Sequence, residues 1–144
     1  MVDQVLLERI VSDIKANVSY LREASDISWE VYQSDRRARR FIERTLHILI
    51  EACLDAAQHI ISDEQFREPA NYRDTFVVLA EQGVIQREEL PRFERMASFR
   101  NLIVHYYERI DDAIVYGVFK RNLEDFDIFV EKILDYLKER SSKE

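Results

Sequence analysis

Three side chains that can do chemistry lie close together in one short segment: Arg100, His105 and Tyr107. A guanidinium can hold a phosphate through two parallel hydrogen bonds. An imidazole can transfer protons near neutral pH. These are the groups that cleavage of RNA without a metal ion requires, and the tyrosine hydroxyl beside them is a group that can be modified covalently. The segment therefore predicts a phosphodiester-cleaving site with a modifiable tyrosine next to it.

The spacing of Arg100 and His105 does not bring both groups onto one phosphate within a single helix. Five residues at about 100° each separate them by about 140° around the helix, and they lie about 7 Å apart along its axis. Two such helices that face each other across a two-fold axis would bring both groups into one shared cleft. We therefore expect a symmetric homodimer, in which Asn101 holds the imidazole or contacts the phosphate.

The same segment also has a purely structural interpretation. Leu102, Ile103 and Val104 are typical core residues, which an arginine and a histidine can flank as ordinary surface groups. Tyrosines in such a position are often half-buried packing residues. Residue types and spacing alone leave both interpretations open.

Composition indicates one globular, helical domain over residues 1–144. Only two glycines and two prolines occur among the 144 residues, so a β-sandwich with many tight turns is disfavoured. The single cysteine, Cys53, cannot form an intrachain disulfide, and the sequence has neither a secretory signal nor a long apolar run. We expect a cytoplasmic protein with no membrane contact.

The net charge of −7 disfavours a general nucleic-acid binder, because phosphate contacts require positive charge. Positive charge is nevertheless concentrated in one short segment. It could be the solvated start of a helix, a surface that steers phosphate, or a docking face for an acidic partner. The candidate contact residues to RNA or to a partner are Arg36, Arg37, Arg39, Arg40 and Arg44.

Apolar residues recur every three or four positions over most of the chain, which predicts helices. A first helix is expected over 6–21, a connection over 25–34, and a second helix over 41–61. Asp74 or Thr75 is expected to cap a short third helix that Gly83 ends.

The fourth helix is expected to begin near Arg87, with Pro91 tolerated in its first turn. A last helix, capped by Asp111 or Asp112, is expected to run to about Leu137, and a polar tail follows from about Arg140. The predicted fold is therefore an all-α, up-and-down bundle of about five helices.

No residue set predicts a metal site or a cofactor. His47 and Glu51 are one helical turn apart, but two ligands do not make a site. His59 also lies near a face expected to be buried. We expect both histidines to be structural.

Much of the chain resembles the HepT branch of the HEPN superfamily, the toxins of bacterial and archaeal toxin–antitoxin pairs. The short signature is an arginine, four to six residues and a histidine, as in Arg100 to His105. Further similarity covers residues 40–46, 50–59, 69–76 and 96–107, together with Ile110, Asp111 and the closing helix. The resemblance extends from about Leu6 to Leu137.

The resemblance implies a HEPN-like dimer whose Arg100 and His105 form a metal-independent endoribonuclease site. It also implies an MntA-like nucleotidyltransferase antitoxin that neutralises the toxin by transferring AMP to a tyrosine two residues after the histidine, here Tyr107. Tyr106 lies in the spacer. Because an adenylyl group brings bulk and negative charge, it would obstruct a cleft that binds RNA phosphate. The alternative is a non-catalytic dimeric module that binds and regulates such a nucleotidyltransferase.

Overall fold

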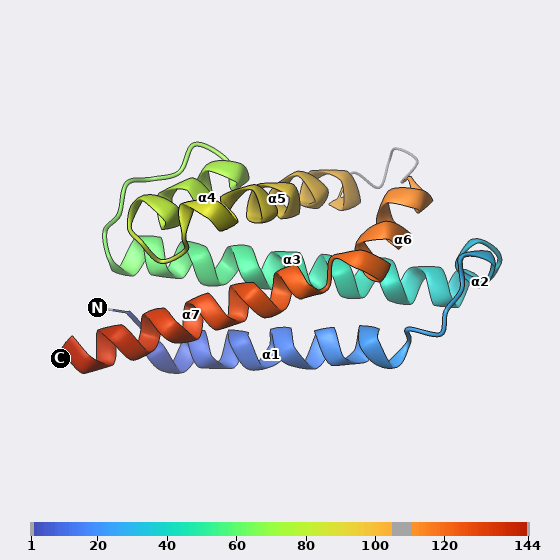
Figure 1. The fold of residues 1–144 in the computed structure, drawn as a ribbon, viewed down its shortest axis with the longest axis horizontal. Coiled ribbons are helices and arrows are strands. Elements are labelled where there is room, and N and C mark those ends of the chain that lie inside the picture. Colours follow the sequence, from blue (N-terminus) through green and yellow to red (C-terminus); the bar gives the residue numbers. More distant parts are fainter. Residues whose placement is uncertain (1, 105–110, 144) are drawn as a thin grey trace.

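Four long helices run up and down alongside one another in the computed structural model (Figure 1). They are α1 (Gln4–Glu23), α3 (Arg36–Asp63), α5 (Leu90–Val104) and α7 (Glu124–Lys143). The structure describes residues 2–104 and 111–143. Three shorter helices complete this part of the chain: α2 (Trp29–Ser34), α4 (Tyr72–Glu81) and α6 (Asp112–Arg121). The turn η1 (Arg87–Glu89) leads into α5, and the described residues form no strand.

The predicted all-α, up-and-down bundle is confirmed, with seven α-helices in the described residues where about five were expected. One additional helix is α2, which lies in the segment expected to be a connection. Ser28 Oγ caps it by accepting a hydrogen bond from the Val31 amide at 3.2 Å. Tyr32 is fully buried there and packs between Trp29 and Tyr116. Tyr32 and Trp29 therefore pack α2 against α6, which carries Tyr116.

The other additional helix arises because the expected last helix is two helices. The helix α6 begins after its cap Asp111, as predicted, and ends at Arg121, with Asn122 as its C-terminal cap. Three acidic residues in the first turn of α7 favour a new start after this break, because they complement the positive end of the helix dipole. At its far end α7 continues through Lys143, so the polar stretch expected as a tail from Arg140 is helical in the structure.

Helix α4 begins one turn before the predicted position. Its cap is Asn71, whose Oδ1 accepts a hydrogen bond from the Asp74 amide at 2.8 Å. Asp74 and Thr75, the expected caps, lie inside the helix. The predicted end is confirmed: Gly83 has φ +76° after the last turn, a left-handed conformation that glycine adopts without strain.

Three phenylalanine rings from three helices form the centre of the core. The Phe76 ring on α4 stacks on Phe93 of α5 with centroids 5.6 Å apart. Phe129 of α7 meets both rings edge-on, at centroid distances of 6.2 and 5.8 Å. All three side chains are fully buried, so this cluster fixes the positions of α4 and α5 relative to the bundle.

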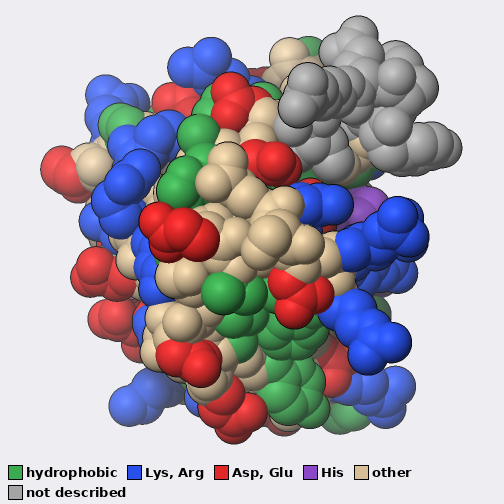
Figure 2. Space-filling view, turned by 90° about the vertical axis from the view of Figure 1, so that its right-hand side faces the viewer, with side chains coloured by type: hydrophobic (Ala, Val, Ile, Leu, Met, Phe, Trp, Pro, Cys, Tyr) green, Lys and Arg blue, Asp and Glu red, His purple; other side chains and the backbone are tan. Residues whose placement is uncertain are grey.

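The surface is mixed in charge. Figure 2 looks onto the end of the bundle that carries α2, α6 and the start of α3, and it shows Lys and Arg side chains on both sides of this end with Asp and Glu side chains between them. No helix in the described part of the chain is both long enough and apolar enough to cross a membrane.

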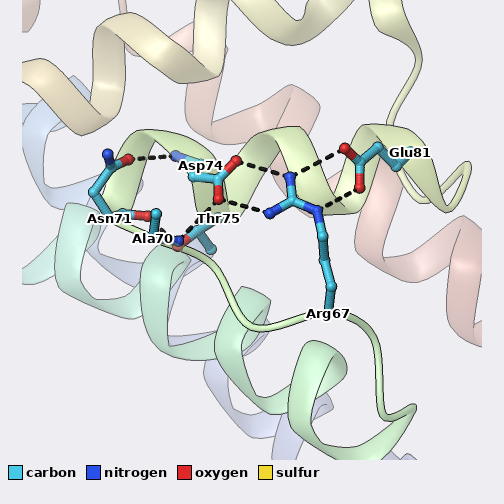
Figure 3. Close-up of polar contacts among 6 residues, drawn as sticks. All are labelled: Arg67, Ala70, Asn71, Asp74, Thr75 and Glu81. Atoms are coloured by element: carbon cyan, nitrogen blue, oxygen red, sulfur yellow. Dashed lines mark hydrogen bonds and ion pairs between the residues drawn. The ribbon is translucent and has the colours of Figure 1, made fainter.

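A network of charged residues holds the start of α4 (Figure 3). The Arg67 guanidinium donates hydrogen bonds to both carboxylate oxygens of Asp74, each at 2.8 Å, and to both of Glu81, at 2.8 and 3.0 Å. Asp74 also accepts a hydrogen bond from the Ala70 amide at 2.9 Å. These bonds connect the loop before α4 to both ends of the helix.

The network lowers the pKa of the carboxyl groups. Hydrogen bonds from Arg67, followed by that from the Ala70 amide, lower the pKa of Asp74 to about 2. Hydrogen bonds from Arg67 also lower the pKa of Glu81 and reciprocally raise the pKa of Arg67. The charged forms of all three groups are therefore favoured in the folded state.

We predict that Phe129→Ala lowers the free energy of unfolding by about 3–5 kcal/mol, because it opens a cavity between two fixed rings. Urea denaturation measures the loss. The control, Tyr20→Ala, changes a side chain on a residue that is 52% exposed and should stay within about 0.5 kcal/mol of the wild type. Equal stabilities of the two variants would contradict the central role of the ring cluster.

We also predict a pH-dependent contribution from the Arg67 network. Because the folded pKa of Asp74 is depressed below its ordinary value of about 3.9, the stabilisation is complete above that value. It is lost as the pH falls from about 4 to about 2. The stability difference between wild type and Arg67→Met, measured by urea denaturation, should therefore shrink over this range. Arg87→Met, an exposed arginine without an ion pair among the described residues, is the control. A difference that stays constant down to pH 2 would contradict the assignment.

Candidate active site

Arg100 lies in the last turn but one of α5 and points toward α3. Its side chain is only 20% exposed, so the guanidinium is partly removed from water. The bundle packs α5 along α3 and α4, and these two helices supply the residues around it (Figure 1).

Two side chains hold the Arg100 guanidinium. Its Nε donates a hydrogen bond to Glu51 Oε1 on α3 at 2.8 Å. Its central carbon lies 4.3 Å from the centre of the Tyr72 ring, at the start of α4, in a cation–π contact. Glu51 and the Tyr72 ring therefore hold the group, and no described residue accepts a hydrogen bond from either Nη atom.

His47 also approaches this centre. Its Nε2 lies 3.6 Å from the same Glu51 oxygen that accepts the hydrogen bond from Arg100. His59 lies elsewhere on α3, with its Nε2 3.4 Å from Asp55 Oδ1. Among the described residues no three His, Cys, Asp or Glu side chains gather as metal ligands. The contact between Glu51 and Arg100 was not predicted, because Glu51 was considered only as one half of a possible metal pair.

His105, Tyr106 and Tyr107 lie outside the described residues, and the described part of α5 ends at Val104. Their predicted roles stay predictions.

Asn101, the predicted supporting residue, is exposed and lines a cleft of about 900 Å³ between α3, α4 and α5. Ser98 of α5, Gln58 of α3 and Asn71 at the start of α4 also line this cleft, so its wall carries several neutral polar groups. Tyr72 belongs to the same wall. The cleft and the Arg100 guanidinium are therefore adjacent, with the Tyr72 side chain between them.

The arginine cluster forms the first turns of α3, where Asp35 caps the helix. The structure separates it into two parts. Arg39 is partly buried and its Nη1 donates a hydrogen bond to the Gln33 carbonyl at 2.9 Å. The other four side chains, of Arg36, Arg37, Arg40 and Arg44, are exposed and form no ion pair with a described residue.

The exposed arginines continue toward the candidate site. Arg40, Arg44, His47 and Glu51 follow one another at intervals of four, three and four residues, and such positions lie on one face of a helix. Because Glu51 contacts Arg100, this face of α3 leads from the basic cluster to the guanidinium. Figure 2 shows a histidine side chain beside the Lys and Arg side chains on one side of this end.

Comparison with known proteins places these features in a family. Residues 14–133 match the family described as "Ribonuclease HepT-like". The mRNA nuclease HepT of Shewanella oneidensis is 36% identical over 83 residues, which cover 58% of this chain and 62% of that protein. The tRNA nuclease HepT of Aphanizomenon flos-aquae is 24% identical over 136 residues, 94% of this chain and 92% of that protein.

A solved structure shows the same arrangement of helices. It is that of the tri-AMPylated Shewanella oneidensis HEPN toxin in complex with MNT antitoxin. The toxin superposes with a TM-score of 0.80 at 27% identity, covering 94% of this chain and 99% of the other. Since the family match extends over most of the sequence, the chain belongs to the HepT-like family.

Proposed function

We propose that this protein is the toxin of a toxin–antitoxin pair and acts as an endoribonuclease at Arg100 and His105. The observation that carries the proposal is the Arg100 guanidinium, held by Glu51 and Tyr72 with both Nη atoms free of described partners. Such a group is prepared to bind a phosphate in two parallel hydrogen bonds. The related nucleases of Shewanella and Aphanizomenon support RNA as the substrate.

The proposed reaction uses the 2′-hydroxyl of the RNA as the nucleophile. Its oxygen bonds to phosphorus as a histidine takes the proton, and the bond from phosphorus to the 5′ oxygen breaks as that oxygen receives a proton. Arg100 neutralises the negative charge that grows on the phosphate oxygens. The products are a 2′,3′-cyclic phosphate and a 5′-hydroxyl. These side chains supply the base, the acid and the positive charge, so the mechanism is metal-independent.

A homodimer fits this chemistry. His105 of one protomer would act as the base and His105 of the second as the acid, in a cleft lined by both copies of Arg100. Asn101 would hold an imidazole or contact the phosphate, from the wall of the cleft that it lines.

We also propose an MntA-like nucleotidyltransferase as the antitoxin, with Tyr107 as the acceptor of AMP. The related Shewanella toxin, which is tri-AMPylated and bound to MNT antitoxin, supports this partner. An adenylyl group two residues beyond His105 would place a negative charge where the RNA phosphate binds. Modification and substrate binding would therefore exclude each other.

The four exposed arginines Arg36, Arg37, Arg40 and Arg44 are proposed to contact RNA or the antitoxin. Arg39 is already held by the Gln33 carbonyl, which makes it the least available of the five.

The first test is cleavage of total cellular RNA by the purified protein in EDTA. We predict that the unmodified wild type cleaves and leaves cyclic phosphate ends. The cleavage rate should fall at least about 100-fold in each of three samples. Arg100→Ala loses the charge that stabilises the phosphate oxygens, and His105→Ala loses the group that transfers protons. In protein adenylylated on Tyr107, the adenylyl group blocks access of the RNA. An unmodified dimer that cleaves no cellular RNA would contradict the enzyme and favour the non-catalytic module that regulates a nucleotidyltransferase.

A second test concerns the arginine cluster. The double variant Arg40→Glu and Arg44→Glu should weaken RNA binding and flatten its salt dependence. Two lost phosphate contacts reduce the slope of log affinity against log salt by roughly 1.4 for a single strand. The control reverses two exposed charges on α1, Arg9→Glu and Lys15→Glu. Unchanged RNA binding with loss of antitoxin binding would assign the cluster to the partner.

A further inference from the structure

The Arg100 guanidinium is restrained in a way that leaves one particular edge available. Its Nε donates a hydrogen bond to Glu51 Oε1 at 2.8 Å, and its central carbon lies over the Tyr72 ring, 4.3 Å from the ring centre. Hydrogen bonding to a phosphate in the bidentate manner requires two parallel N–H groups. The edge formed by the two Nη atoms is the part of the group that still offers them, because no described residue accepts their hydrogens.

Glu51 cannot contribute to phosphate binding by direct contact. Its carboxylate is negative, and its side chain is 43% exposed beside a group proposed to bind an anion. Two negative groups in such proximity repel each other, so Glu51 opposes RNA binding by charge alone. A role that requires a carboxylate here must therefore act through Arg100.

Tyr72 is suited to the same task from a second direction. The Arg67 network and the Asn71 cap fix the first turn of α4, in which Tyr72 lies (Figure 3). The ring thus provides a fixed surface over which the guanidinium lies. Together with the hydrogen bond from Nε to Glu51, this contact restrains the orientation of the guanidinium.

We propose that Glu51 and Tyr72 are positioning residues that orient the Nη edge of Arg100 toward the scissile phosphate. The inference rests on the proposed ribonuclease function. A guanidinium held in advance does not need to reorganise as charge develops in the transition state. Loss of either support therefore slows the chemical step and leaves ground-state binding of RNA largely intact.

The test measures two quantities on dimeric, full-length protein. The first is the single-turnover cleavage rate of an RNA oligonucleotide that the wild type cuts. The second is the affinity for the same strand with a 2′-deoxy nucleotide at the cleavage point, by fluorescence anisotropy. Because this analogue lacks the nucleophile, its binding is measured without chemistry.

For Glu51→Ala we expect a cleavage rate about 10- to 100-fold lower, with an affinity for the analogue that is unchanged or tighter. Glu51→Gln keeps a hydrogen-bond acceptor and should lose less. Tyr72→Phe keeps the ring and should cleave as the wild type does, while Tyr72→Leu should be about tenfold slower. Asp55→Asn is the matched control, a carboxylate one turn further along α3 that pairs with His59, and its rate should not change.

Several results would overturn the inference. In the first, Glu51→Ala and Glu51→Gln cleave RNA at the wild-type rate while Arg100→Ala is inactive. The positioning role of Glu51 would then be wrong, and the proposed ribonuclease function would remain. Another is a parallel fall in rate, analogue affinity and melting temperature in the Glu51 variants, which would make the contact merely structural. If Arg100→Ala itself cleaves like the wild type, the proposed function fails and the inference fails with it.

Discussion

The contact between Arg100 on α5 and Glu51 on α3 is the constraint around which this part of the molecule is arranged. With 20% of the Arg100 side chain exposed, the guanidinium is partly removed from water, and a charged partner offsets the cost of this burial. Only one register of α5 along α3 places Glu51 beside Arg100. A shift by one helical turn, about 5.4 Å, would separate the two groups.

Apolar packing and polar networks secure that register in different ways. The rings of Phe76, Phe93 and Phe129 fix α4 and α5 against α7 inside the core. On the surface, the Arg67 network fixes the loop and the first turn of α4, and with it the Tyr72 ring under Arg100. Burial therefore places the helices, and directional hydrogen bonds set the orientation of the groups proposed to act.

The distribution of charge is compatible with the proposed RNA site in an acidic chain. The net charge is −7, yet four exposed arginines lie at the start of α3 on the face that leads to Glu51 and Arg100. Because exposed charges act over about 8–10 Å in physiological salt, the local cluster matters more to a phosphate at this face than the total does.

The sequence predicted the long helices well because their buried stripes repeat over many turns, as with Phe93, Met96 and Ala97 in α5. The prediction of helices was wrong where a helix is too short to show a period or where the apolar spacing continues across a break. Helix α2 has six residues, too few for a clear period, and only Ser28 marks its start. The break at Asn122 is hidden because the apolar spacing of Phe119, Leu123 and Phe126 continues across it.

The candidate site was predictable in part for similar reasons. Arg100 was identified by its type and its distance from His105. Its partner Glu51 was not, because the two are 49 residues apart and meet only through the packing of α3 against α5. The cap of α4 was predicted to be Asp74 or Thr75. Asp74 is a good capping residue, but its carboxylate accepts hydrogen bonds from Arg67 and the Ala70 amide.

The most direct test of the central claim, an Arg100–His105 site that uses the 2′-hydroxyl of RNA, is cleavage in EDTA of two matched oligonucleotides. One is all-ribose, and the other has a single 2′-deoxy nucleotide at the cleavage point. Our account predicts that the protein cuts only the first at this point and leaves a 2′,3′-cyclic phosphate. Cleavage of both strands at equal rates would contradict it, because the nucleophile would then not be the 2′-hydroxyl.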